Sequence, residues 1–250
     1  MPIERHKGMF ASRGKSQLFD ELSEVYDRLL PRREKSRPAV LDDCDFGAPR
    51  RVRDNTMVYR QVLLHRSILL FEGSLDAAAD ENAYSMALSI RGHFETTAAL
   101  GYVHYRLASV QMKNISAAEF DEGLSAQMLG TKDKSLPDAP DPKHVLTMLE
   151  YADKTVNKHV VIGAGQPLPL LTDPYNWLCE FCHPNYHSNA IAIDVDKSVP
   201  EFRFRFEQPM RDIEFGLLGN LMFSAPLFVD IFDLIPKMLP ENSNRDAPSN

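Results

Sequence analysis

Hydrophobic residues recur every three or four positions along most of the chain, which is the spacing that places them on one face of an α-helix. Polar capping residues and prolines mark where such helices begin and end. The helices predicted in this way begin near residues 15, 54, 80, 116, 142, 174 and 209. We therefore expect a mainly α protein that forms a bundle of about six or seven helices.

Capping residues indicate where several of these helices begin. Ser116 and Glu119 have the spacing of a capping box before a short helix, which Gly130 would close. Asp141–Pro142 and Asp173–Pro174 each place a capping side chain before a proline, and proline is favoured at the first position of a helix. These signals predict the starts of three helices after residue 115.

The chain shows no internal repeat and no linker of distinct composition, so we expect one helical domain over residues 1–250. The polar residues 1–14 are expected to be frayed. Prolines and glycines predict loops over residues 31–53 and 131–143. Residues 240–250 are expected to form a disordered tail.

One segment has the two-residue period of β-strands. Its apolar positions are Ile191, Ile193 and Val195, followed by Phe202, Phe204 and Phe206. A single antiparallel register pairs Val195 with Phe202, Ile193 with Phe204 and Ile191 with Phe206. The same register places Asp194 opposite Arg203. We predict a β-hairpin near residues 190–206, and because an isolated hairpin is only marginally stable, we expect its aromatic face to pack on the helices.

The last helix is apolar but short for a bilayer. The uncharged stretch Phe215–Val229 has 15 residues and contains Pro226, whereas a membrane-spanning helix needs about 20. We therefore predict a buried helix that Pro226 breaks or kinks, and no membrane association. Residues 1–8 are too polar for a signal peptide, and three cysteines are too few for a disulfide scaffold. These features predict a cytoplasmic protein.

The charge is unevenly distributed. The net charge of −7 argues against non-specific binding of nucleic acid by the whole surface. Residues 1–66 nevertheless contain 14 Lys and Arg against 10 Asp and Glu, while the rest of the chain contains 14 against 25. Two basic clusters lie in the first part, namely Arg32, Arg33, Lys35 and Arg37, and then Arg50, Arg51 and Arg53. They are either solvated loop charges or a local patch that contacts phosphate.

A polar pair interrupts an apolar stripe on the helix near residues 82–111. The stripe consists of Tyr84, Leu88, Arg91, Glu95, Ala99 and Tyr102, which are spaced three or four apart. If Arg91 and Glu95 are buried there, each must be paired with an opposite charge. They form a structural ion pair, a surface pair or part of a functional pocket.

A later helix, near residues 174–183, offers a second polar group. Tyr175 lies on its apolar stripe, and His183 lies at its expected end, because Pro184 disfavours a helical conformation at the residue before it. The negative end of the helix would favour a charged imidazole, and so would Glu95 if it were nearby. His183 either caps its own helix or belongs to the same site as Glu95.

Arg91 and Glu95 at a spacing of four, with Tyr175 and His183 on a later helix, resemble the pattern of a family of uncharacterised bacterial all-helical proteins. That family is similar to the HEPN superfamily of helical bundles, many of which are ribonucleases in antiphage or toxin systems. The resemblance covers about residues 55–190. It implies that Arg91, Glu95, Tyr175 and His183 meet in one polar site between helices.

The chain departs from the HEPN pattern at its central motif. HEPN ribonucleases carry an arginine, four to six further residues and then a histidine on one helix, but the corresponding positions before His183 hold Asn176, Trp177 and Leu178. Arg60 and His65 have the required spacing, which chance alone supplies in a chain of this composition. A nuclease would need Arg91 to supply the cation from another helix, with His183 as acid or base.

Cofactor motifs are weak. Cys179, Cys182 and His183 match the string for covalent haem attachment, and with His187 they suggest zinc. Both cysteines lie on the apolar stripe of a predicted helix, where free cysteine behaves as a small hydrophobe. We therefore expect no cofactor and no metal.

Two functions are compatible with these patterns, and whether the chain is an enzyme stays open between them. The first is a helical protein with a buried Arg/Glu/Tyr/His site that processes RNA or a nucleotide, HEPN-like, with those four side chains as its catalytic residues. The second is a non-catalytic interaction module in which the polar cluster is structural. An exposed apolar patch formed by Phe202, Phe204 and Phe206 would indicate the second. The sequence leaves the partner open, with RNA, a nucleotide and a second copy of this chain as candidates.

Overall fold

The protein is mainly α-helical, as predicted. The computed structural model describes residues 2–37, 45–160, 168–196, 198, 201–206 and 208–239. The helices in these ranges are η1 (Pro2–His6), α1 (Lys7–Ser12), α2 (Ser16–Leu29), η2 (Leu30–Arg32), α3 (Pro49–Ala79), α4 (Ala83–Gln111), α5 (Ala117–Leu129), α6 (Val145–Val160), α7 (Thr172–Cys182), α8 (Tyr186–Ala192), α9 (Asp212–Phe215) and α10 (Leu218–Met238). The strands are β1 (Ile193–Asp196) and β2 (Glu201–Phe204).

The described chain has more helical segments than the six or seven expected. The additional α-helices are α1, α8 and α9, which have 6, 7 and 4 residues. A helix this short spans barely two turns and leaves no periodic apolar pattern in the sequence. The longer helices agree with the prediction in number and order.

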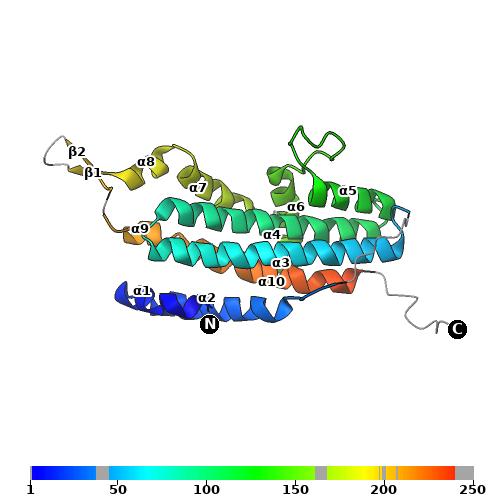
Figure 1. Ribbon diagram of the computed structural model, residues 1–250, viewed down its shortest axis with the longest axis horizontal. Helices are drawn as coiled ribbons and strands as arrows, with labels where there is room; N and C mark the ends of the chain where they lie inside the picture. The colour runs from blue at the N-terminus through cyan, green and yellow to red at the C-terminus, as the bar shows by residue number, and fades with distance from the viewer. Residues whose placement is uncertain are drawn as a thin grey trace.

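Helix α4 lies at the centre of the bundle, where it packs against α3, α6, α7 and α10 (Figure 1). It is buried on almost every side, with Ala98 and Leu100 fully inaccessible. Small residues allow its neighbours to approach closely. A Cβ atom added at Gly101 would lie 2.6 Å from the Cβ of Ala152 on α6. Any larger residue at this position would push α6 away from α4.

The prediction that residues 1–14 are frayed is wrong. This segment forms η1 and α1, and the side chains of Ile3 and Phe10 are buried. The ring of Phe10 contacts Phe19 of α2 and Phe215 of α9, with ring centroids 5.4 and 5.2 Å apart. Two isolated apolar residues in a polar segment are enough to attach it to the core, although they show no periodicity.

Helix starts were predicted well where a side chain caps its own helix. Asn82 accepts a hydrogen bond from the backbone of Ser85 at the start of α4, and Ser116 forms the predicted capping box with Glu119 at the start of α5. Helix α3 instead begins at Pro49, which shortens the loop predicted over residues 31–53. Positions 38–44 of that loop lie outside the described residues, as does the predicted tail 240–250.

The two Asp-Pro signals do not cap their helices. Helix α6 begins at Val145, after Asp141–Pro142. Helix α7 begins at Thr172, and its first backbone N–H groups are capped by Asp153 of α6, whose carboxylate accepts bonds from the backbone of Leu171 and Thr172 at 2.6 and 3.2 Å. A cap that comes from another helix leaves no local signal in the sequence.

Helix α10 continues through both of its prolines, Pro226 and Pro236, so the expected break at Pro226 is absent. Apolar residues before and after Pro226 pack into the same core, and this packing outweighs the lost backbone hydrogen bond. Among the described helices, the segment Asp212–Met238 is long and apolar enough to cross a bilayer, but most of it is buried inside the bundle. It is therefore a core helix, as predicted.

A buried histidine joins three helices at the centre of the bundle. His93 of α4 is fully buried, and its Nε2 lies 2.8 Å from the hydroxyl of Ser67 on α3. Its Nδ1 lies 2.9 Å from the hydroxyl of Ser224 on α10. Burial lowers the pKa of His93 to about 3. The ring is therefore neutral, with one nitrogen donating and the other accepting.

The first prediction concerns this histidine. In the unfolded chain an imidazole has a pKa of about 6.5, so between pH 6.5 and 3 the unfolded state binds the extra proton. The free energy of unfolding should therefore fall as the pH drops through this window, by about 2 kcal/mol between pH 6.5 and 5. His93→Gln keeps both hydrogen bonds without a titrating group. Denaturant titrations at pH 7 and 5 should show a smaller loss for the variant, and equal losses would contradict the neutral buried ring.

Candidate functional site

The structure brings Arg91, Glu95 and Tyr175 together between α4 and α7. An Nη atom of Arg91 donates to the hydroxyl of Tyr175 at 3.0 Å and lies 3.3 Å from a carboxylate oxygen of Glu95. The same hydroxyl donates to Glu95 at 3.4 Å. The three side chains form a triangle of hydrogen bonds and charges, in which the buried Nε of Arg91 has no hydrogen-bond partner. The shared stripe on α4 therefore does face a later helix, as its spacing indicated.

The pKa values of Tyr175 and Arg91 both lie far above neutral pH. Burial raises the pKa of Tyr175 to about 12. Burial works to lower the pKa of Arg91, but the hydrogen bond with Tyr175 and the charge of Glu95 outweigh it and raise the pKa above its ordinary value. The phenol thus stays neutral and the guanidinium stays charged. Neither group is suited to move a proton near pH 7.

His183 lies outside the triangle. It is the C-cap residue of α7, its side chain is exposed, and no described residue gives its imidazole a hydrogen bond or an ion pair. Tyr175 lies near the start of α7 and His183 at its end, so eight residues, or about 12 Å of helix, separate them. The expectation that α7 ends at His183 is confirmed, but the geometry joins only three of the four predicted residues.

The cysteines near His183 form no metal site. Cys179 and Cys182 are free and half buried, and burial raises the pKa of the Cys182 thiol. No group of three or more His, Cys, Asp or Glu side chains within the described ranges could hold a metal ion. Trp177 packs edge-on against Phe181 at 4.6 Å, and Phe181 lies 5.4 Å from the ring of His187. His187 thus packs among aromatic rings.

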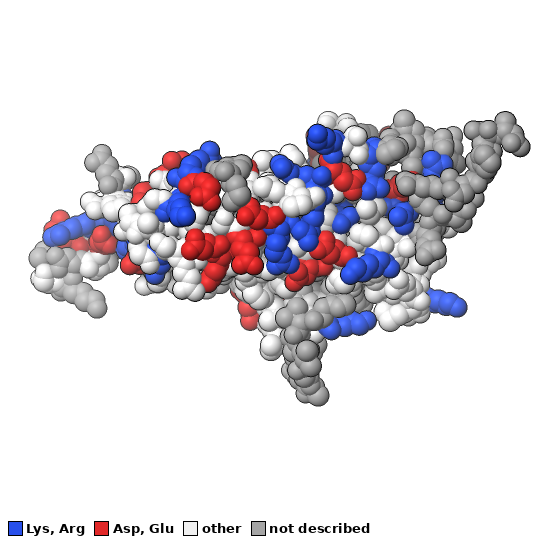
Figure 2. Space-filling view, turned by 90° about the horizontal axis from the view of Figure 1, so that it is seen from below, with Lys and Arg blue, Asp and Glu red and all other residues white. Residues whose placement is uncertain are grey.

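The basic clusters are largely neutralised by acidic neighbours. Arg32 pairs with Asp233 of α10 at 2.5 Å, and Arg51 pairs with the buried Asp121 of α5 at 2.7 Å. Arg37 pairs with Glu34. Figure 2 shows acidic and basic side chains interleaved across the middle of one face of the molecule. This face lacks the single-sign field that attracts a nucleic acid.

The β-hairpin has the predicted register, but it presents its aromatic side to solvent. Phe202 pairs with Val195 and Phe204 pairs with Ile193. Phe202, Phe204 and Phe206 are nevertheless 65%, 69% and 91% exposed. We call Val195, Phe202, Phe204 and Phe206 the aromatic face. The prediction that this face packs on the helices is wrong.

A buried ion pair explains the orientation of the hairpin. Arg205 follows β2 on the side opposite the aromatic face, and its side chain is only 7% exposed. It lies 3.0 Å from the carboxylate of Glu214, which is 2% exposed and also receives Arg211 at 2.5 Å. Arg205 further donates to the backbone carbonyl groups of Ile191 and Pro209. The polar side of the hairpin is therefore attached to α9.

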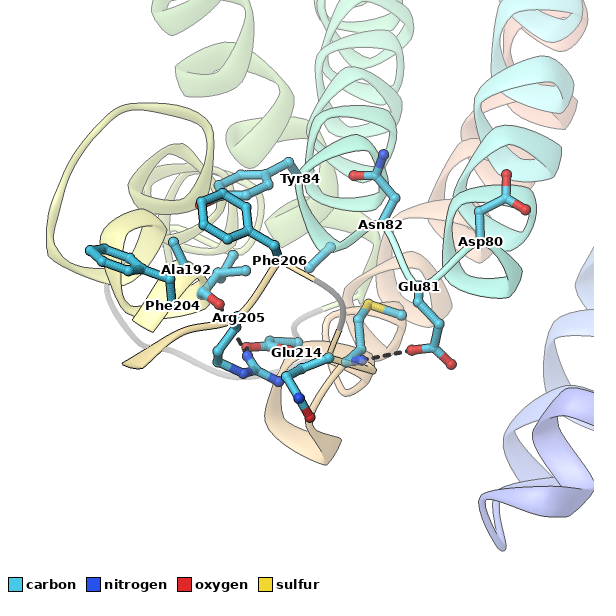
Figure 3. Close-up of a pocket in the computed structure, with 13 residues that line it drawn as sticks. Asp80, Glu81, Asn82, Tyr84, Ala192, Phe204, Arg205, Phe206 and Glu214 are labelled. Carbon is cyan, nitrogen blue, oxygen red and sulfur yellow. Dashed lines mark hydrogen bonds and ion pairs between the residues drawn. The ribbon is translucent and has the colours of Figure 1, made fainter. Parts of the chain in front are cut away.

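A pocket lies between the hairpin and the junction of α3 and α4 (Figure 3). Tyr84 and Phe206 lie together on one side of it, with Phe204 further along the hairpin. Asp80 and Glu81 lie on the opposite side. The pocket has a volume of about 510 Å³. It combines an aromatic wall with two carboxylates, of which Glu81 is paired with Arg13.

The sequence reasoning missed the residues that hold the hairpin in place. Glu214 stands between Ile213 and Phe215, and a charge within an apolar run is a signal for a buried pair. The alternation of Phe and Arg over 202–206 shows that one side of the strand is aromatic and the other cationic. It does not show which side faces the helices, because that depends on the position of Glu214 in space.

The second prediction tests whether the triangle is structural. Tyr175→Phe removes one hydroxyl that accepts from Arg91 and donates to Glu95, so the free energy of unfolding should fall by about 1–2 kcal/mol. Chemical denaturation measures this change. Tyr186→Phe is the matched control, since Tyr186 is 80% exposed and no described residue hydrogen-bonds its hydroxyl. Equal stability of Tyr175→Phe and the wild type would show that the triangle contributes nothing.

The third prediction concerns the buried ion pair of the hairpin. Glu214→Gln removes the buried counter-charge of Arg205 and leaves it only Asp194, which lies 3.4 Å away and is half exposed. Breaking a buried pair costs about 3–5 kcal/mol where no other counter-charge remains, and the cost here should be smaller. The loss should be local, so backbone amides of residues 192–206 should exchange with deuterium much faster while those of α4 stay protected. Hydrogen exchange with mass spectrometry measures both segments in one experiment. Unchanged exchange in the hairpin would show that the pair does not hold it.

No protein-family model matches this chain, and neither a curated protein nor a solved structure shows significant similarity to it. The resemblance to the HEPN-like family therefore stays a prediction.

Proposed function

We propose that this protein is a cytoplasmic helical interaction module, which binds a partner protein through the aromatic face of its hairpin. One observation carries the proposal: three phenylalanines on one strand and its extension expose most of their surface, while the side chain of Arg205, on the other side of the same strand, is buried. An ordinary surface hairpin has the opposite arrangement, with its apolar side covered. Contiguous exposed apolar surface of this kind is typical of a protein interface.

The anchoring of the hairpin supports a binding function. Arg205, Glu214 and Arg211 attach the strand to α9 through several charge-assisted bonds. Because the platform is held in place, a partner that covers the aromatic face does not have to order it first, which lowers the entropic cost of binding. Large aromatic side chains also contribute most of the binding energy in many interfaces.

The described contacts give less support to RNA processing. Arg91, Glu95 and Tyr175 are paired with one another, apart from the buried Nε of Arg91, and the pKa of Tyr175 is far from neutral. The exposed imidazole of His183 is the group that could act as acid or base, and it lies outside the triangle. Arg32, Arg37 and Arg51 are already paired with carboxylates. We therefore infer that the polar cluster is structural.

The cytoplasmic location is part of this proposal. Its support is that the apolar helix α10 is used as a core element, with Leu221, Phe228 and Ile235 fully buried. Cys179 and Cys182 are present as free thiols, which suits a reducing compartment.

The fourth prediction tests the aromatic face in cells that naturally contain this protein. A photo-crosslinking phenylalanine analogue placed at Phe204 should give discrete crosslinked products with another protein. The same analogue at Leu69, a 53% exposed residue of α3, is the control for random collisions. Products are separated by size and identified by mass spectrometry.

Matched variants decide whether the crosslink reports a specific interface. With the analogue at Phe202, the substitutions Phe204→Ser and Phe206→Ser should abolish the products. The substitutions Val62→Ser and Leu69→Ser change exposed apolar residues elsewhere and should leave them intact. Equal products at Phe204 and Leu69, or cleavage of RNA by purified protein that is lost on His183→Ala, would contradict the proposed function.

A further inference from the structure

Two thiols lie on the same face of α7, close to its end. Cys179 and Cys182 are three residues apart on the helix, and both are free and half buried. In an α-helix, Cα atoms at this spacing are about 5 Å apart. Disulfide bonds join residues whose Cα atoms are about 4.4–6.8 Å apart. The backbone therefore places the two cysteines within reach of a disulfide bond.

The helix ends where this bond would form. Cys182 is the last residue of α7, and His183 after it has an extended backbone. The backbone N–H of His183 donates to the carbonyl of Cys179 at 3.1 Å and so closes the last turn. On a regular helix, Cβ atoms three residues apart are about 5–6 Å from each other, whereas a disulfide brings them to about 3.5–4.5 Å. The last turn must therefore tighten, which is easier at a helix end than in its interior.

A cation lies beside the two sulfurs. The guanidinium of Arg91 on α4 interacts with both Cys179 and Cys182. Burial raises the pKa of the Cys182 thiol, and Arg91 opposes this rise. The Nε of Arg91 is buried and has no hydrogen-bond partner. A thiolate is a stronger acceptor than a thiol because it is charged, so the guanidinium favours the ionised form that attacks disulfides.

We propose that Cys179 and Cys182 form a reversible thiol–disulfide site, which a low-molecular-weight disulfide oxidises and in which Arg91 stabilises the attacking thiolate. The thiolate of one cysteine attacks a sulfur of the small disulfide, whose S–S bond breaks as a mixed disulfide forms and one thiolate leaves. The second cysteine loses its proton and attacks the first, which expels the other thiolate. The leaving thiolates take up the two protons. Two cysteine thiols are thus oxidised to one disulfide, and the small disulfide is reduced to two thiols.

The geometry favours a disulfide that is easily reduced again. The bond would close a loop of four residues, Cys179–Cys182, and so short a loop removes little conformational entropy from the unfolded chain. The tightened last turn adds strain, and strained disulfides are the labile ones. Helix α7 is followed in the chain by α8 and β1, so the site lies where this part of the chain can respond to oxidation. The inference does not depend on the aromatic face.

The fifth prediction is that the two cysteines are oxidised as a pair. Cys44 lies outside the described residues, and Cys44→Ser leaves one pair of thiols in the full chain. This protein is equilibrated with reduced and oxidised glutathione at a series of ratios, and free thiols are trapped with N-ethylmaleimide. Mass spectrometry should show that both thiols disappear together in oxidising buffer, without attached glutathione, and return together in reducing buffer. Thiols that stay reduced at every ratio would overturn the proposal.

Single-cysteine variants are the matched controls for pairing. In Cys179→Ser and in Cys182→Ser, the remaining thiol has no neighbour that can displace glutathione from it. Each variant should therefore keep one glutathione attached in oxidising buffer, whereas the chain with both cysteines should keep none. Equal retention of glutathione in all three proteins would show that the two sulfurs do not reach each other, and the site would be wrong.

Variants of Arg91 test the effect of the cation. Arg91→Gln should slow the reaction of the thiols with oxidised glutathione by about threefold or more, because a smaller fraction is ionised, and Arg91→Lys should restore most of the rate. Arg106→Gln changes an arginine of α4 that donates to the carbonyl of Glu119, and this control should react like the parent protein. Circular dichroism checks that each variant is folded. Equal rates in folded Arg91→Gln and the parent would overturn the role of the cation.

Hydrogen exchange measures the change in the backbone and needs no variant of Arg91. Because the disulfide tightens the last turn of α7, amides of residues 180–184 should exchange at a different rate in the oxidised protein, while those of α4 stay protected. Identical exchange of residues 180–184 in the reduced and oxidised protein would contradict the proposed geometry.

Discussion

A charged group that is buried needs an opposite charge beside it. The ion pair between Arg205 and Glu214 meets this need, and in doing so it fixes the orientation of the hairpin. The carboxylate of Glu214 is almost inaccessible, so the guanidinium groups of Arg205 and Arg211 must come to it. Side chains alternate along a strand, and placing Arg205 against α9 therefore turns Phe204 and Phe206 outward. The outward direction of Phe204 and Phe206 is thus a consequence of the charge pair on the other side of the same strand.

The same kind of polar junction organises the bundle around α4. His93 contacts hydroxyl groups from α3 and α10, and Asp153 of α6 caps the first turn of α7. Burial raises the pKa of Asp153, which the hydrogen bonds from Thr172 and Leu171 oppose. Apolar contacts supply the driving force of such a bundle, but they tolerate sliding between helices. Groups that lose a hydrogen bond when a helix shifts favour one arrangement, because each unsatisfied buried polar atom costs about 1–3 kcal/mol.

Local patterns predicted most of the fold, while the contacts between distant segments could not be predicted from them. The start of α4 at Asn82, the capping box at Ser116 and the strand register depend on residues that are close in sequence, and all three are confirmed. The cap of α7 by Asp153 and the attachment of Phe10 depend on residues far away in the chain. The polar triangle could be predicted in part, because Arg91 and Glu95 share a face of α4. The distance of His183 from the triangle could not be predicted, because it depends on which part of α7 packs against that face.

The polar triangle and the aromatic face differ in what they leave unsatisfied, and this difference assigns them different functions. In the triangle, the hydroxyl of Tyr175 accepts from Arg91 and donates to Glu95, so a ligand would have to break existing bonds in order to enter. On the aromatic face, three rings remain exposed to water. Free energy is available where apolar surface and charge are still exposed, because a partner gains contacts there without displacing any. The hairpin exposes apolar surface that the triangle does not, and this difference supports the proposal that the hairpin binds another protein.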